Sequence, residues 1–201
     1  MVFLEARERR GKHRVARYSA GHKEKTREAI VEAAAERIRT GGLEAVGVAA
    51  IMAEAGLTHG GFYAHFASRD GLLAAAIGRL FDKAVAGVGR YEEKYGAKDG
   101  LARYVDFYLS PRHRDDATIG CPIPALAGEA RRSAGEVKRA FDEGFDRLAA
   151  RLGKLMPKGG KRAAVALLAE LAGTLAISRA IGDAKQSNEL LAAKRKSVLA
   201  S

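Results

Sequence analysis

The sequence predicts an all-α protein of about nine helices, in which an N-terminal three-helix unit precedes a larger helical domain. Three observations support this class. Ala, Leu, Glu, Arg and Lys dominate a chain of 201 residues with only four prolines, and these residues favour helices. Apolar residues recur every three or four positions, and no long stretch alternates apolar and polar residues as a strand would. With 47% hydrophobic residues, the chain can bury a real core.

The first third of the chain predicts three short helices separated by glycines. The helices begin at about residues 23, 48 and 59, and they end at the Gly41–Gly42 pair, Ala55 and Phe66. Gly56 lies where the second helix needs a left-handed residue at its end. Thr58 is placed to cap the third helix. A tight glycine-containing turn between the second and third helices is the layout of a helix-turn-helix.

Ser68 is placed to cap a fourth helix, with Asp70 in its first turn. The chain is expected to loosen around residues 96–100, and a polar loop should cover residues 110–120. Further helices are expected over residues 101–109, 122–131, 135–156, 161–181 and 187–198. The helix over 161–181 is apolar on nearly every side, so another subunit is expected to cover it.

The net charge of +11 favours an acidic partner, which could be nucleic acid, an anionic membrane surface or an acidic ligand. Residues 1–27 hold nine Lys/Arg and three Glu, a net charge of +6. Residues 1–22 therefore predict a flexible basic arm, which either touches DNA or is a solvated tail. Residues 28–66 hold two Arg and five Glu, a net charge of −3, so this segment is not basic by itself.

Several classes of protein are disfavoured. A single cysteine, Cys121, excludes an internal disulfide and fits a reducing compartment. The N-terminus has no apolar core of signal-peptide length, and the apolar run 163–178 is short and interrupted by Glu170, so a cytoplasmic protein without a membrane span is expected. No phosphate loop, paired metal ligands or nucleophile elbow occurs, so no enzyme, cofactor or metal is expected.

Residues 42–73 resemble the DNA-binding signature of the TetR/AcrR family. The most specific part is Phe-Tyr-Ala-His-Phe-x-Ser-Arg-Asp-x-Leu at residues 62–72. The resemblance is close over residues 25–73, and residues 120–129 resemble a segment found in one branch. It implies a homodimeric transcriptional repressor that responds to a small molecule and binds a palindromic operator in double-stranded DNA.

The resemblance also implies individual roles. Phosphate contacts are implied for Thr58, Tyr63, His65 and Arg69, and positions near the base edges for His59, Gly60 and Gly61; Lys25 is a further candidate DNA contact. Two departures weaken the pattern. Gly47 replaces the usual Ser/Thr cap, and Gly61 replaces a small polar residue that often reads a base. Tyr63 could instead be a packing residue and His65 an ordinary surface side chain.

An effector pocket among the later helices is implied as well. Its candidate lining residues are Tyr104, Phe107, Tyr108, Cys121, Phe141, Phe145 and Thr174, although any one of them could be ordinary core. Cys121 lies at an expected helix start, which can lower a thiol pKa and favour electrophile sensing. The alternative is a small buried residue at a tight turn.

The resulting organisation is a basic arm at 1–22, a helix-turn-helix domain at 23–67 and an effector-binding and dimerisation domain at 68–201. The dimer is expected to form through the helices at 161–181 and 187–198. The alternative function is a protein-interaction module on a degenerate helix-turn-helix that no longer binds DNA. The net charge of −3 over residues 28–66 keeps that alternative open.

Overall fold

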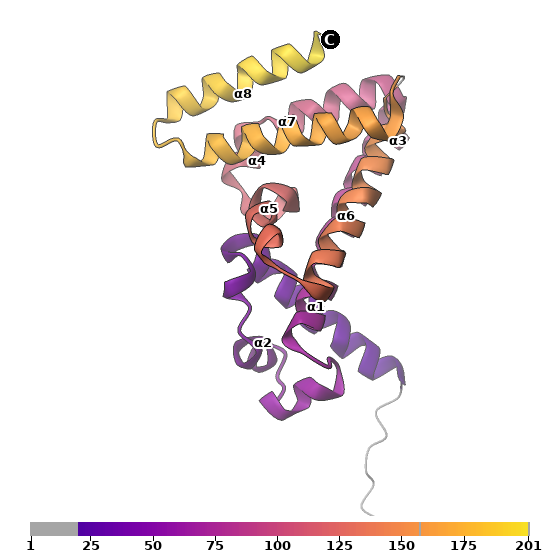
Figure 1. Cartoon of the computed structure of the whole chain (residues 1–201), viewed down its shortest axis with the longest axis vertical. Helices are drawn as coiled ribbons and strands as arrows, with labels where there is room; N and C mark the ends of the chain where they lie inside the picture. The colour runs from indigo at the N-terminus through magenta and orange to yellow at the C-terminus, as the bar shows by residue number, and fades with distance from the viewer. Residues whose placement is uncertain (1–19, 157, 201) are drawn as a thin grey trace, which may run out of the picture.

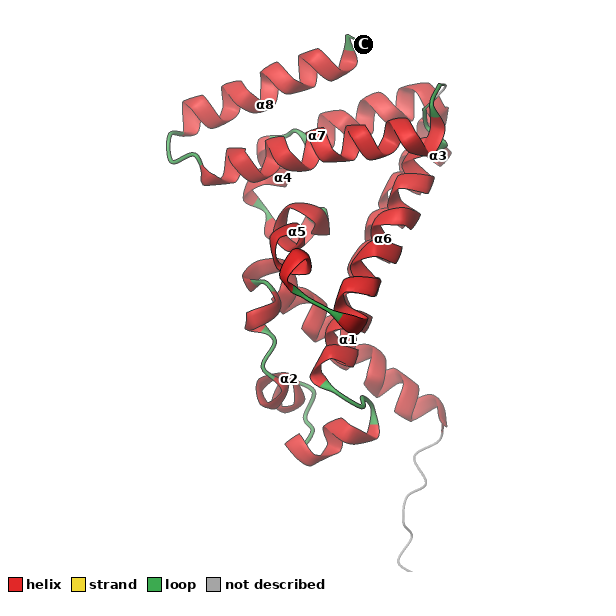
Figure 2. Cartoon of the chain, in the orientation of Figure 1, coloured by secondary structure: helices red, strands yellow, loops and turns green. Residues whose placement is uncertain are grey.

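The computed structural model describes residues 20–156 and 158–200, so most of the predicted arm lies outside the described residues. All regular structure in this part is helical, as Figure 2 shows, which confirms the predicted class. The α-helices are α1 (Ala20–Gly41), α2 (Val48–Glu54), α3 (Arg69–Tyr108), α4 (Pro111–Asp115), α5 (Pro122–Arg132), α6 (Gly135–Gly153), α7 (Gly160–Ala180) and α8 (Ala184–Leu199). Short 3-10 helices are η1 (Leu43–Ala45), η2 (His59–Ala64) and η3 (Ala117–Ile119).

The molecule has a helix-turn-helix unit at one end and the neighbouring helices α7 and α8 at the other (Figure 1). The first part of α3 and the whole of α6 run side by side in the same direction between these ends. Gly71 lies beside Glu136, Phe81 beside Gly144 and Gly89 beside Arg151. The paired α3 and α6 form a strut between the two ends of the molecule. Helices α7 and α8 lie across the end of this strut that is farther from α2.

The helix-turn-helix unit has its own small core. Ile30 and Ile38 of α1, Ile51 and Met52 of α2 and Phe62 of η2 are all nearly inaccessible to solvent. Gly56 adopts φ 68°, the left-handed conformation expected at the end of α2. The chain therefore reverses direction between the end of α2 and the start of η2, at the turn that the sequence predicts.

The third helix differs from its prediction. It is a 3-10 helix ending at Ala64 and not an α-helix reaching Phe66. Thr58 occupies the capping position, but its side chain makes no capping hydrogen bond. The adjacent Gly60 and Gly61 explain the difference, because glycine is about 1 kcal/mol less favourable than alanine in an α-helix. Gly47 likewise gives α2 no side-chain cap, as its identity predicts.

Helix α3 begins as predicted and then continues further than predicted. The Ser68 hydroxyl caps it by accepting from the Gly71 N–H at 3.0 Å. The expected loosening over 96–100 is a single break at Gly96, with φ 73°, after which the helix resumes to Tyr108.

The predicted loop over 110–120 contains α4 and η3. Ser110 caps α4 by accepting from the His113 N–H at 3.2 Å, and Pro111 fits its first turn. Ser-Pro therefore begins a helix here as well as ending one.

Helix α7 is buried on one side only. It packs against α3, α4, α5, α6 and α8, and its exposed apolar or small residues are Val165, Ala166, Ala169, Gly173, Ile177 and Ala180. Among the described residues, Gly160–Ala180 is the one helix long and apolar enough to cross a membrane, a test that the core helix of a soluble protein also passes. Its packing against five helices of the same chain fits the second interpretation.

Candidate DNA-binding surface and effector cavity

The recognition segment η2 separates exposed from buried side chains as the sequence predicts. Thr58, His59 and Gly60 are exposed, and the Tyr63 side chain is 69% accessible. Phe62 and Phe66 are buried and stacked, with ring centroids 5.6 Å apart. The two phenylalanines fix the segment on the core, so the polar side chains and the glycine backbone face outward.

His65 is half-buried and lies near the beginning of α1. Burial lowers the pKa of His65, and the positive charges of Lys23 and Arg27 lower it further. The Arg27 guanidinium lies over the Phe66 ring, 5.0 Å from its centroid. The start of α1 thus adds two cations to this surface, besides the exposed Lys25. Sequence reasoning missed Lys23 and Arg27, although their spacing of four residues would have placed them on one helix face.

Arg69 is engaged within the protein. Its Nε donates to the Val46 carbonyl at 3.2 Å, and its Nη2 donates to the Leu43 carbonyl at 2.8 Å. Arg69 therefore ties the start of α3 to the loop before α2. This structural role stands beside the phosphate contact that the resemblance implies.

Part of the acidic charge in residues 28–66 is neutralised within the chain. Glu32 on α1 pairs with Arg79 at 2.8 Å and with Lys83, both on α3. Although burial opposes it, these two cations hold the pKa of Glu32 below its ordinary value. Glu54 pairs with Arg37 inside the helix-turn-helix unit. The Arg37–Glu54 pair is already counted in the net charge of −3, whereas the pairing of Glu32 with cations of α3 lowers the acidity available to repel DNA.

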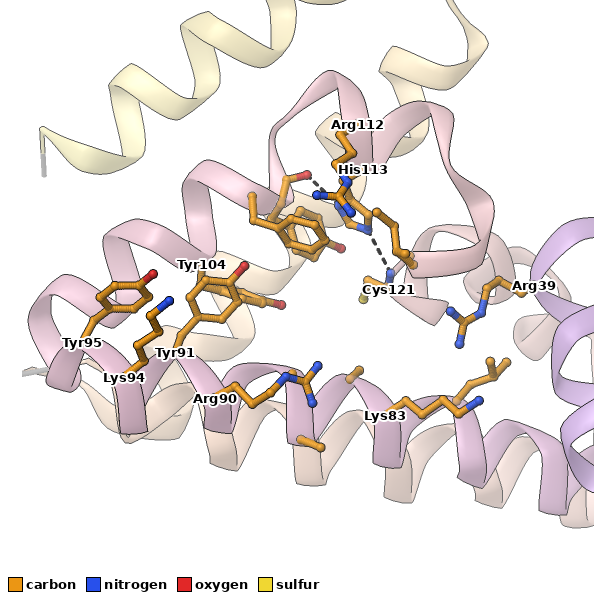
Figure 3. A pocket seen from close by; sticks show the side chains of 18 residues that line it. Arg39, Lys83, Arg90, Tyr91, Lys94, Tyr95, Tyr104, Arg112, His113 and Cys121 are labelled. Carbon is orange, nitrogen blue, oxygen red and sulfur yellow. Dashed lines mark hydrogen bonds between the residues drawn. The ribbon is translucent and has the colours of Figure 1, made fainter. Parts of the chain in front are cut away.

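A cavity of about 670 Å³ lies between α1, α3 and the α4–α5 segment (Figure 3). Aromatic rings from α3 form one wall. The Tyr91 ring centroid is 5.8 Å from that of Tyr104 and 6.4 Å from that of Phe107. Tyr104 and Tyr108 are 5.7 Å apart. The volume is in the range that encloses drug-sized ligands.

His113 is buried at the edge of this aromatic wall. It is stacked on Phe107 at 5.0 Å, its Nδ1 bonds the Tyr108 carbonyl at 2.8 Å, and its Nε2 accepts from the Cys121 N–H at 3.0 Å. These partners require the neutral tautomer with the proton on Nδ1. Burial lowers the pKa of His113 to about 4 despite the bond to the Tyr108 carbonyl. Sequence analysis treated His113 as one of five scattered histidines and missed this role.

Cys121 occupies the capping position of α5, where a helix start was expected, and its side chain is buried. Burial raises the pKa of the Cys121 thiol, which is opposite to the lowering that a helix start can produce. Loss of hydration outweighs the helix dipole at this fully buried sulfur. The structure favours the packing interpretation, with the thiol beside the Tyr108 hydroxyl.

The predicted pocket residues divide into two groups. Tyr104, Phe107, Tyr108 and Cys121 line the cavity together. Phe141, Phe145 and Thr174 lie outside it. Phe141 packs edge-on against Phe81 at 5.5 Å and stacks with Phe145 at 6.4 Å. The Thr174 hydroxyl donates to the Glu170 carbonyl at 2.8 Å within α7.

Basic side chains complete the cavity lining, and sequence analysis named none of them. They come from α1, α3 and α4: Arg39, Lys83, Arg90, Lys94 and Arg112. Figure 3 shows Arg39 reaching in from one side and Arg90 from the α3 side. In the sequence, cations at exposed helix positions predict only a solvent-exposed helix face. Only the approach of three separate helices brings them to one cavity.

The comparisons with known proteins agree with this geometry. The family model described as bacterial regulatory proteins, tetR family, matches residues 30–76, which extend from α1 into α3. Over these residues the chain carries the sequence of a tetR-family DNA-binding domain. The predicted resemblance to this family is thus confirmed over residues 30–76, where the structure also has the helix-turn-helix.

Solved structures of tetR-family regulators resemble most of the chain. A TetR-family regulator from Agrobacterium tumefaciens is 21% identical with a TM-score of 0.71, covering 88% of this chain and 97% of its own. One from Cytophaga hutchinsonii is 18% identical with a TM-score of 0.72, covering 89% and 94%. The reduced form of NemR from E. coli is 19% identical with a TM-score of 0.69, covering 87% and 96%. At these identities the likeness establishes the fold alone. No curated protein matches the chain.

Proposed function

We propose that this protein is a homodimeric, cytoplasmic repressor of the tetR family that leaves its palindromic operator when a small molecule fills the cavity. The observation that carries the proposal is the position of Arg39. This residue belongs to α1 of the helix-turn-helix unit, yet it lines the cavity and its Nη1 donates to the Thr118 carbonyl of η3. A ligand there would contact the DNA-binding unit directly.

Two further contacts tie the unit to the rest of the chain. The Leu43 N–H donates to Glu129 Oε2 on α5 at 3.0 Å, and Glu32 on α1 pairs with Arg79 and Lys83 on α3. A ligand that displaced α3, α4 or α5 would therefore reorient the helix-turn-helix. Release follows if the two recognition segments no longer match half-sites about one DNA turn apart.

The dimer is proposed to form through α7 and α8. The exposed face of α7 is apolar and rich in small residues, which allow close helix packing. Burying this face against a second copy would remove it from water at about 25 cal/mol per Å² of apolar area. The two helices also lie at the end of the molecule opposite α2, which leaves the DNA-binding surfaces free (Figure 1).

Within this proposal, residues 1–22 are an arm, 23–67 bind DNA, and 68–201 bind effector and partner subunit. Helix α1 already begins at Ala20, within the span assigned to the arm. The proposed DNA contacts are Lys25, Thr58, His59, Gly60, Gly61, Tyr63, His65 and Arg69, and Lys23 and Arg27 join them because of their position beside His65.

The decisive experiment identifies a DNA site by selection from random duplexes and measures affinity by fluorescence anisotropy. Tyr63→Phe keeps the exposed ring and removes the hydroxyl. We expect about tenfold weaker binding or more, because hydrogen bonds to charged groups contribute about 1.5–3 kcal/mol. Tyr95→Phe is the matched control, since Tyr95 lies in α3 beside the cavity, and it should leave affinity unchanged.

If Tyr63→Phe and the wild type bind DNA with equal affinity, the Tyr63 hydroxyl is not a DNA contact. Failure of selection to enrich any sequence would overturn the repressor proposal and favour the protein-interaction module instead.

A further inference from the structure

The cavity lining carries a strong charge imbalance. Five cationic side chains from three helices line it, and none of the carboxylates among the described residues does. Lys83 is shared with Glu32, and Asp116 lies close enough to Arg112 and Arg39 for their charges to lower its pKa. The Asp116 carboxylate also accepts from the Thr118 N–H at 2.9 Å. These two acids leave the lining with a clear positive excess.

Two buried donors in the lining lack a strong acceptor. Within the described part of the chain, Arg39 Nε has no hydrogen-bond partner, and the Tyr108 hydroxyl has only the Cys121 thiol beside it, whose sulfur is a weak acceptor. Both residues line the same cavity. Buried donors without partners are uncommon in folded proteins and call for an explanation. A ligand oxygen inside the cavity would satisfy both kinds of donor.

The remaining lining is aromatic and uncharged. The ring centroid of Tyr91 lies 5.8 Å from that of Tyr104 and 6.4 Å from that of Phe107. His113 adds a ring stacked on Phe107, and its hydrogen bonds keep it neutral. This wall suits a flat or apolar body, whereas the cations and these two donors suit an acidic group.

We infer that the cavity binds an organic anion that carries a carboxylate, sulfonate or similar acidic group on an aromatic body. The aromatic body lies against the tyrosine wall, and the acidic group lies among Arg39, Arg90 and Arg112. This inference rests on the proposed function, because it names the chemical class of the effector.

The same anion would act on the DNA-binding unit. Arg39 holds α1 to η3 through the Thr118 carbonyl, and Lys83 holds α1 to α3 through Glu32. An acidic group that draws either cation toward itself weakens its contact with the neighbouring element. Anion binding is thereby coupled to the orientation of α1.

The test compares two fluorescent probes with the same ring system. 1-Anilinonaphthalene-8-sulfonate carries a sulfonate, and N-phenyl-1-naphthylamine is the same molecule without it. Fluorescence titration of the full chain at low salt should show at least tenfold tighter binding of the sulfonate. The double variant R90Q/R112Q should weaken sulfonate binding about tenfold and leave the neutral probe unchanged, because only the acidic group loses partners.

The matched control is R131Q/R132Q, which removes the same charge from the exposed end of α5 outside the cavity. It should bind both probes as the wild type does, and circular dichroism should show that both double variants are folded. Equal affinity for the two probes, or an equal effect of the cavity and control variants, would overturn the inference.

A DNA-binding measurement distinguishes this inference from the proposed repressor function on which it rests. The sulfonate should release the wild type from its DNA site, and R90Q/R112Q should need about tenfold more of it. Selective sulfonate binding without any release would uphold the anion site and overturn effector-controlled repression.

Discussion

At the scale of single residues, His113 shows how the fold sets the chemistry of the cavity. Its ring nitrogens join the Tyr108 carbonyl at the end of α3 to the N–H of Cys121 before α5. Arg179 from α7 supports the same region by donating to the His113 carbonyl at 2.9 Å and the Arg114 carbonyl at 3.0 Å. The imidazole is therefore a buried connector between helices, and only its neutral form fits both partners.

This environment predicts a specific pH dependence. The pKa of His113 falls from 6.5 to about 4 on folding, so the folded state favours the neutral ring. The stabilisation is complete above pH 6.5 and is lost as pH falls from there through 4. Between pH 7 and pH 4.5 the loss should be about 2–3 kcal/mol, measured by urea unfolding of the wild type.

His113→Gln should remove that part of the pH dependence, whatever its effect on stability at pH 7. NMR titration of the five histidines should assign a value near 4 to the signal that the variant lacks. Identical pH profiles for the two proteins, or a titration near 6.5, would show that the ring is not held neutral.

At the scale of elements, the pairing of α3 with α6 forms the strut between the two ends of the molecule. Gly144 of α6 lies directly against Phe81 of α3, which is fully buried. A Cβ at Gly144 would come within 2.9 Å of the Phe81 Cβ and closer still to its ring. Glycine at this position therefore sets how closely the two helices approach.

Gly144→Ala should destabilise the fold by about 1–3 kcal/mol, because overpacking forces side chains or backbone to move. Gly78→Ala is the matched control on α3, where a Cβ meets nothing within 4 Å. That change should stabilise the protein by up to about 1 kcal/mol through helix propensity. Thermal and urea unfolding of both variants measures the difference, and equal behaviour would contradict the tight contact.

At the scale of the whole molecule, the proposed assembly depends on the exposed face of α7. Ile177 is 57% accessible and Val165 is 37% accessible in the isolated chain. Helix α8 stays attached to α7 within the chain, since Lys194 pairs with Glu170 and the Ser187 hydroxyl donates to the Ser178 carbonyl at 2.7 Å. The open face of α7 is thus available to a second copy.

Ile177→Arg should shift the protein from twice its 21.4 kDa chain mass to the single mass, because the arginine charge would be buried in the interface. Sedimentation equilibrium measures the change, and DNA affinity should fall with it. Ala127→Arg, on the exposed side of α5, is the control and should leave the mass unchanged. A wild type that sediments as a single chain would exclude the proposed dimer.

The helices and the DNA-binding unit could be predicted from the sequence because they depend on local interactions. Gly56 reverses the chain, Ser68 caps α3, and Phe62 and Phe66 mark the buried side of the recognition segment. Each effect acts within a few residues. The 3-10 form of η2 was not predicted. The α-helix and the 3-10 helix differ little in free energy over so short a segment, and the adjacent Gly60 and Gly61 disfavour the α-helix.

The cavity was decided by the tertiary structure. Arg39, Lys83 and Arg112 are far apart in the sequence, and none has a local pattern that differs from solvated surface. Packing of α1, α3 and α4 places them around one aromatic wall, and burial raises the pKa of Cys121 where the helix start alone suggested the opposite. Desolvation and charge proximity depend on distance in space, so they become defined only when the helices pack.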